Sequence, residues 1–80
     1  MSTQHLIEMV NDIGAYFAFE PDRSRALQGF VSHIERYWEP RMRHKLIAAF
    51  IADGGRGLDP LVHQGVQLLH DREAASLHTS

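Results

Sequence analysis

The stretch RYWEPRMRHK, residues 36–45, joins two amphipathic runs at Pro40 and contains the only tryptophan of the chain. A proline disfavours the α conformation of the residue before it, here Glu39, and therefore ends the preceding helix. Its fixed φ angle suits the first turn of a new helix. The stretch therefore predicts a corner between two helices, surrounded by the tryptophan and four of the eight lysine and arginine residues.

Large aromatic rings and guanidinium groups gather at this corner. Such side chains supply much of the binding energy at interfaces between proteins. We therefore predict that the corner binds a partner protein through Arg36, Tyr37, Trp38, Arg41, Met42 and Arg43. The alternative is that Tyr37 and Trp38 pack into the core of the domain beneath solvated arginines. The sequence leaves open whether Trp38 belongs to the core or to the interface.

Three prolines divide the chain into four parts, and each part carries apolar residues at helical spacing. We expect helices over about residues 3–18 and 22–38, with an N-cap aspartate at the start of the second. The third helix is expected to end at Asp53, where a glycine pair follows. The fourth is expected to begin at Pro60, directly after another N-cap aspartate.

The length and composition fit one small folded domain. The chain has 80 residues, 44% of them hydrophobic and 22% charged, which is too apolar for a disordered protein. It has no cysteine, so neither disulfides nor thiolate metal sites support the core. The sequence therefore predicts an all-α fold, a single domain of about four short helices over residues 1–73, followed by a flexible tail over residues 74–80.

The charge and hydropathy patterns bear on the partners. The chain has no run approaching the roughly 20 apolar residues that span a bilayer, so we expect a cytoplasmic protein without membrane contact. A net charge of −2 argues against nucleic-acid binding, which depends on many cations. The alternative is a small helix-turn-helix DNA-binding regulator, because Arg41, Arg43, His44 and Lys45 follow Pro40. That alternative requires an affinity for duplex DNA that falls steeply with salt.

No residue pattern predicts catalysis, a metal site or a cofactor site. The six histidines include no pair at helical i, i+4 spacing. Ser32 and His33 are adjacent on a predicted helix and point about 100° apart, so they do not form a nucleophile and base pair. The run GGRG, residues 54–57, follows a helix rather than a strand, and we interpret it as a helix end with a flexible connection instead of a phosphate loop.

Three segments carry a resemblance to a known family: MVNDIGAYF at residues 9–17, HIERYWEPRMR at residues 33–43 and GGRGLDPLV at residues 54–62. In these segments the chain resembles the delta subunit of soluble NAD-dependent formate dehydrogenase. The central segment is the most distinctive of the three. The chain departs mildly from the family pattern at Asp12, where glutamine is more common, and at Tyr16, where phenylalanine is more common.

The resemblance implies a non-catalytic accessory subunit that binds the large (alpha) subunit. In such enzymes the large subunit carries a bis-molybdopterin guanine dinucleotide centre with molybdenum or tungsten together with iron-sulfur clusters, and other subunits pass electrons to FMN and NAD. The resemblance implies that the delta chain binds none of these cofactors. Its implied role is assembly, cofactor retention or stabilisation of the complex, either as a permanent subunit or as a transient maturation factor.

The number of large apolar residues in so short a chain predicts that the isolated protein exposes apolar surface. A core of this size is not expected to hold all of Phe17, Phe19, Phe30, Phe50 and Leu69. Exposed apolar patches seek partners. We therefore expect the isolated chain to be marginally stable or to self-associate, with a homodimer about a two-fold axis as the possible form.

Overall fold

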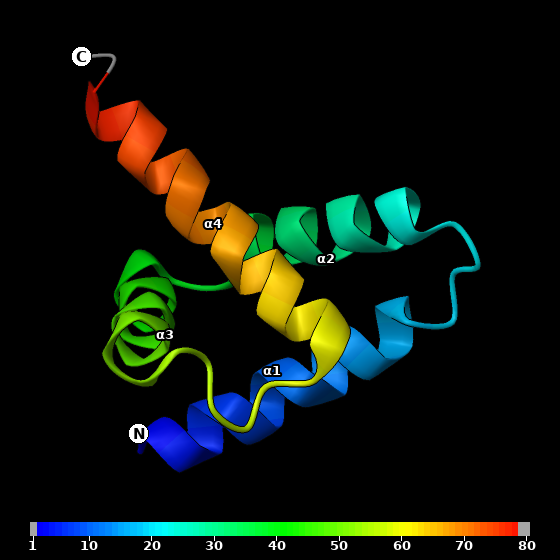
Figure 1. Cartoon of the computed structure of the whole chain (residues 1–80), viewed down its shortest axis with the longest axis horizontal. Coiled ribbons are helices and arrows are strands. Elements are labelled where there is room, and N and C mark those ends of the chain that lie inside the picture. Colours follow the sequence, from blue (N-terminus) through cyan, green and yellow to red (C-terminus); the bar gives the residue numbers. More distant parts are fainter. Residues whose placement is uncertain (1, 79–80) are drawn as a thin grey trace.

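The computed structural model describes the backbone of residues 2–78 and the side chains of residues 2–76. This part of the chain forms four helices and no strand, which confirms the predicted all-α class. Figure 1 shows α1 (Thr3–Phe17), α2 (Arg23–Tyr37), α3 (Pro40–Asp53) and α4 (Pro60–His78).

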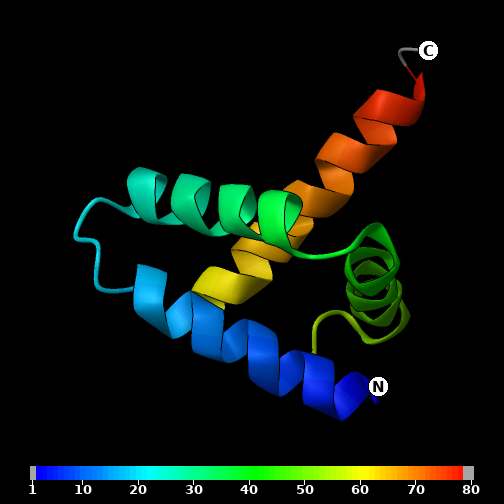
Figure 2. The same ribbon diagram turned by 180° about the vertical axis from the view of Figure 1, so that it is seen from behind.

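The helices α1 and α2 run in roughly opposite directions and diverge from their connecting turn (Figure 1). The helix α4 crosses one face of this pair and packs most extensively against α2. Figure 2 shows the opposite side, where α2 passes in front of α4. The helix α3 lies at the diverging end of the pair, close to the beginning of α1. This arrangement leaves one face of the α1–α2 pair without a covering helix.

The helix boundaries follow local signals in the sequence. The side chain of Asp22 caps α2 by accepting hydrogen bonds from the backbone N–H groups of Ser24 and Arg25, at 3.0 and 3.3 Å. Pro40 is the first residue of α3, after two residues with extended backbone. Gly54 ends α3 with a φ angle of 74°, a left-handed conformation that glycine adopts without steric cost. The predicted cap at Asp22, the end of α3 before Gly54 and the corner at Pro40 are confirmed.

The last helix is longer than the sequence pattern indicated. Residues 74–78 are helical and continue α4, whereas we expected the helical pattern to fade before this segment. Ala74 and Ala75 favour helix, and Glu73 ties the preceding turn to α3 through ion pairs. The flexibility of residues 74–80 stays a prediction, and residues 79–80 lie outside the described part of the chain.

Side chains from all four helices and from the corner at Pro40 form the core. Glycines let the helices approach closely: a side chain at Gly14 would meet Val62 of α4, and one at Gly65 would meet the ring of Phe30. As expected, the core does not hold all five of the large residues named above: Phe30, Phe50 and Leu69 are buried, Phe17 is half-buried and Phe19 is exposed. The residues of the main buried cluster are Leu6, Val10, Phe30, Val31, Ile34, Trp38, Leu46, Ile47, Phe50, Val62, Val66 and Leu69.

Hydrogen bonds hold the connection between α3 and α4, which we expected to be flexible, and its flexibility stays a prediction. The Asp53 carboxylate accepts from two successive backbone N–H groups of the loop, at 3.1 and 3.2 Å. The side chain of Asn11 in α1 donates to the carbonyl of Gly57 at 2.9 Å and accepts from the N–H of Asp59 at 3.0 Å. These two hydrogen bonds of Asn11 join the loop to α1.

Candidate functional site

The structure separates the six residues that we predicted at the corner into buried and exposed groups. Trp38 is only 7% exposed and belongs to the core, and Met42 is partly buried against that core. Arg36, Arg41 and Tyr37 are exposed, Tyr37 to 71%. Trp38 therefore belongs to the core, as in the alternative that the sequence left open. The three exposed residues, Arg36, Tyr37 and Arg41, are the corner residues that a partner could reach. Their role in binding stays a prediction.

Arg43, the sixth predicted residue, makes contacts within the chain. Its Nε donates to the carboxylate of Glu73 in α4 at 3.0 Å, and its Nη1 donates to the backbone carbonyl of Glu35 in α2 at 3.4 Å. The same Glu73 carboxylate lies 3.3 Å from Nε2 of His44. Arg43 therefore joins α3 to both α2 and α4, and its guanidinium is already used in holding the corner together.

An exposed aromatic surface lies between α1 and α2, and we call it the aromatic groove. Its residues are Ile13, Tyr16, Phe17, Phe19, His33 and Tyr37. Neighbouring rings are in contact: the ring centroids lie 5.1 Å apart for Tyr16 and Phe17, 5.7 Å for Phe17 and His33, and 4.9 Å for His33 and Tyr37. No residue of α4 is among them, so the groove lies on the face of the α1–α2 pair that α4 leaves uncovered.

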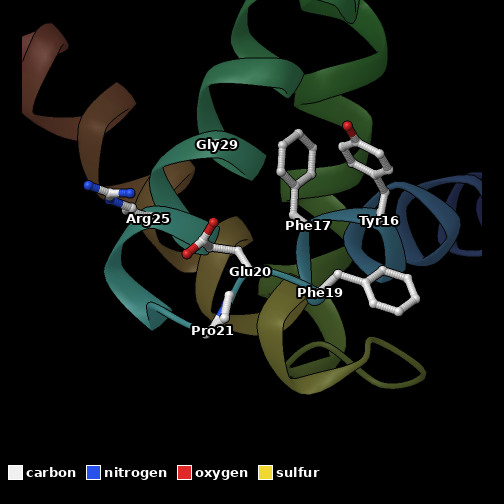
Figure 3. A pocket seen from close by; sticks show the side chains of 7 residues that line it. All are labelled: Tyr16, Phe17, Phe19, Glu20, Pro21, Arg25 and Gly29. Carbon is white, nitrogen blue, oxygen red and sulfur yellow. The ribbon is translucent and has the colours of Figure 1, made fainter.

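Gly29 positions the central ring of the groove. A Cβ atom at this position of α2 would lie 2.8 Å from the ring of Phe17, so only glycine leaves room for that ring. Figure 3 shows Phe17 and Tyr16 standing side by side, with Phe19 pointing away from both. Phe19 is 87% exposed and Tyr16 is 73% exposed. The last turn of α1 and the connection that follows it therefore each present one large ring to solvent.

The groove consists of two open hollows on either side of Phe17. One has a volume of about 480 Å³ and includes Phe19, Glu20 and Arg25 in its lining, and the other has a volume of about 570 Å³ and ends at Tyr37. Volumes of this size occur in ligand pockets, but those bury most of the ligand surface, whereas these hollows open to solvent. Their shape suits side chains from another protein.

Exposed charged residues adjoin the groove residues on both helices, and we use these positions to define its two edges: Asp12 directly precedes Ile13 on α1, and Arg36 directly precedes Tyr37 on α2. On the α2 edge, the guanidinium groups of Arg25 and Arg36 make no hydrogen bond or ion pair within the described residues. On the α1 edge, Asp12 is exposed and its carboxylate is also without a partner there. Glu20, at the turn, accepts the backbone N–H of Asp22 at 3.1 Å. The groove thus has an acidic edge on α1 and a basic edge on α2.

Of the most exposed groove residues, the sequence indicated Tyr37 at the corner and Phe19 among the large residues that the core would not all hold, but not Tyr16. Tyr16 lies outside the face of α1 that forms the core, which consists of Leu6, Val10 and Gly14. The sequence also explains why Phe19 is the most exposed of the large residues. It stands between the end of a helix and a proline, where no helix face is available to bury it.

The described residues offer no cluster of potential metal ligands. No group of three or more histidine, aspartate or glutamate side chains gathers there in a way that could hold a metal ion. The Nε2 atom of His63 lies 3.0 Å from the carbonyl of Gly54 and thus contacts the α3–α4 loop. Within the described part of the chain, no helix is long and apolar enough to cross a membrane.

Comparisons with known proteins identify the family. Neither the curated proteins nor the solved structures that were searched contain a significant match. The family model of the NADH-dependent formate dehydrogenase delta subunit, FdsD, matches residues 5–66. This match spans most of the chain, including the corner, the aromatic groove and the loop that Asn11 holds. The chain therefore belongs to the family of formate dehydrogenase delta subunits.

Proposed function

We propose that this chain is a non-catalytic accessory subunit of a soluble NAD-dependent formate dehydrogenase and that it binds the large (alpha) subunit of that enzyme. The observation that carries the proposal is the family match over residues 5–66. The exposed aromatic groove supports it, because large exposed apolar patches mark interaction sites. We place the protein in the cytoplasm with the enzyme.

The contact surface that we propose combines the exposed corner residues with the groove. Tyr37 belongs to both, and Arg36 and Arg41 flank it with unpaired guanidinium groups. Planar guanidinium groups bind carboxylates and backbone carbonyls in two-pronged geometry. Trp38, Met42 and Arg43 contribute indirectly, because they fix the corner on which these side chains stand.

The chain acts on the cofactors of the complex through protein contacts alone. In this proposal the large subunit holds the bis-molybdopterin guanine dinucleotide centre, with molybdenum or tungsten, and the iron-sulfur clusters, while FMN and NAD bind elsewhere in the complex. Cysteine thiolates are the usual ligands of iron-sulfur clusters, and this chain has none. Its contribution is to support assembly, cofactor retention or stability of the assembled enzyme.

Co-purification tests the proposal. A tagged form of the chain is expressed together with the other formate dehydrogenase subunits, and we expect it to recover the large subunit under gentle conditions. Enzyme produced without the chain should contain less metal or lose activity faster on storage. Failure to recover the large subunit, combined with unchanged metal content and stability, would contradict the proposed role.

The same experiment separates a permanent subunit from a maturation factor. A permanent subunit is recovered in equal amounts with cofactor-loaded large subunit, whereas a maturation factor is recovered only with large subunit that lacks the metal centre. When it is isolated from its complex, we propose that the chain associates with a second copy of itself. The DNA-binding alternative gains no specific support, since Arg43 is held within the chain.

A further inference from the structure

The charges along the aromatic groove are arranged so that the groove complements itself. Asp12 directly precedes the groove residue Ile13 on α1, Arg36 directly precedes the groove residue Tyr37 on α2, and Arg25 lines the hollow near the turn. None of these three charged groups has a partner among the described residues. Asp12 and Arg36 lie at similar levels along the groove, because their neighbours Ile13 and Tyr37 line the same hollow. At the other end, Glu20 and Arg25 line one hollow together.

In a dimer whose two-fold axis runs along the groove, the opposite charges on the two edges face each other. Rotation about such an axis places α1 of one copy over α2 of the other and keeps each residue at its own level. Asp12 of each copy then faces Arg36 of the other, and Glu20 faces Arg25. Because a two-fold interface repeats every contact, each of these pairs occurs twice.

The apolar side chains between the two edges supply the burial that such an interface needs. Phe19, Tyr16 and Tyr37 are the three most exposed large apolar side chains among the described residues. All three lie in the groove, and Tyr and Phe are enriched at protein interfaces. Open hollows on either side of Phe17 are available to rings of the opposite copy.

We propose that the isolated chain forms a two-fold symmetric dimer through the aromatic groove, with Asp12 of each copy paired to Arg36 of the other. This deepens the self-association proposed above by assigning it a surface and a symmetry. The dimer covers Tyr37 and Arg36, two of the residues that we assign to the contact with the large subunit. The groove is then covered until the large subunit is present, and dimerisation competes with assembly of the enzyme.

Charge reversal with rescue tests the pairing. Sedimentation equilibrium of the isolated chain at low salt is measured for the parent protein, for Asp12→Arg, for Arg36→Asp and for the double variant. Each single variant turns two attractions into two repulsions, and we expect the dimer dissociation constant to rise about tenfold. The double variant restores both pairs with their charges exchanged, so we expect its dissociation constant to return to within about threefold of the parent.

Two controls keep the result interpretable. Arg56→Asp makes the same charge change at an exposed arginine of the α3–α4 loop, outside the groove, and should leave the dissociation constant unchanged. All exchanged side chains are exposed, and circular dichroism melts should match that of the parent within the small range usual for surface substitutions. The single-variant effects should also shrink at high salt, because screening weakens exposed charge pairs.

The outcomes distinguish the separate proposals. A parent chain that stays monomeric up to high concentration overturns the dimer. A parent dimer that tolerates both single variants, or a double variant that fails to recover, overturns the groove as its surface. Neither result bears on the accessory-subunit role, which the co-purification experiment tests with the assembled enzyme.

Discussion

Trp38 and its neighbour Tyr37 should respond to replacement by alanine in opposite ways. Trp38 is 7% exposed and packs in the core, so Trp38→Ala removes a buried indole and leaves a cavity, at a cost of about 3–5 kcal/mol. A chain of 80 residues has a total stability of about 4–12 kcal/mol. Tyr37 is 71% exposed, and Tyr37→Ala should change stability by less than about 0.5 kcal/mol.

Urea unfolding followed by circular dichroism measures both effects. For a domain of this size the slope is about 1 kcal/mol per M urea, so Trp38→Ala should lower the midpoint by about 3 M or more, or leave the chain unfolded without urea. Tyr37→Ala should stay within about 0.5 M of the parent and weaken recovery of the large subunit instead. Trp38→Phe keeps most of the buried ring and should recover much of the loss. Equal midpoints for the two alanine variants would refute the placement of Trp38 in the core.

Three further replacements probe the contacts that hold the helices together. Asn11→Ala removes both hydrogen bonds to the α3–α4 loop and should lower the free energy of unfolding by about 0.5–2 kcal/mol, even though alanine has the higher helix propensity. Gln4→Ala, which removes an exposed amide of the same helix, is the control. Equal melting temperatures for the two variants would contradict a stabilising role of the Asn11 hydrogen bonds. Gly65→Ala forces a Cβ into the ring of Phe30 and should destabilise by about 1–3 kcal/mol despite its better helix propensity, so a raised melting temperature would contradict the packing. Glu73→Gln removes the negative charge that Arg43 and His44 contact and should cost about 1 kcal/mol at low salt, with a smaller effect in 1 M NaCl, whereas a salt-independent loss would point to another cause.

The features that the sequence predicted correctly are those with local causes. The cap at Asp22, the corner at Pro40 and the left-handed end of α3 at Gly54 each depend on a few neighbouring residues. Such features are decided by the backbone preferences and side-chain hydrogen bonds of neighbouring residues, with little influence from the rest of the chain. The all-α class follows from them together with the helical spacing of the apolar residues.

The features that the sequence did not reveal depend on which helices meet. Asn11 and Gly57 are 46 positions apart, and nothing near either residue indicates that they bond. The aromatic groove exists because Gly29 admits the ring of Phe17 between two helices while α4 covers the other face. Likewise, the spacing of Trp38 fits both a core and an interface position, and its burial follows from how α3 folds back against α1 and α4.

The hydrogen bonds of Asn11 also set the order in which this protein can fold on the ribosome. Asn11 is synthesised 46 and 48 residues before the two loop residues that it binds. At about 5–20 residues per second, the interval is about 2–10 s. During that time α1 has none of its contacts to α4, and the apolar face around Val10 has only part of its partners. The packing of α1, the first helix to be made, is therefore completed only after α4 begins to emerge. A nascent chain stalled before Pro60 would expose the apolar face of α1 to chaperones.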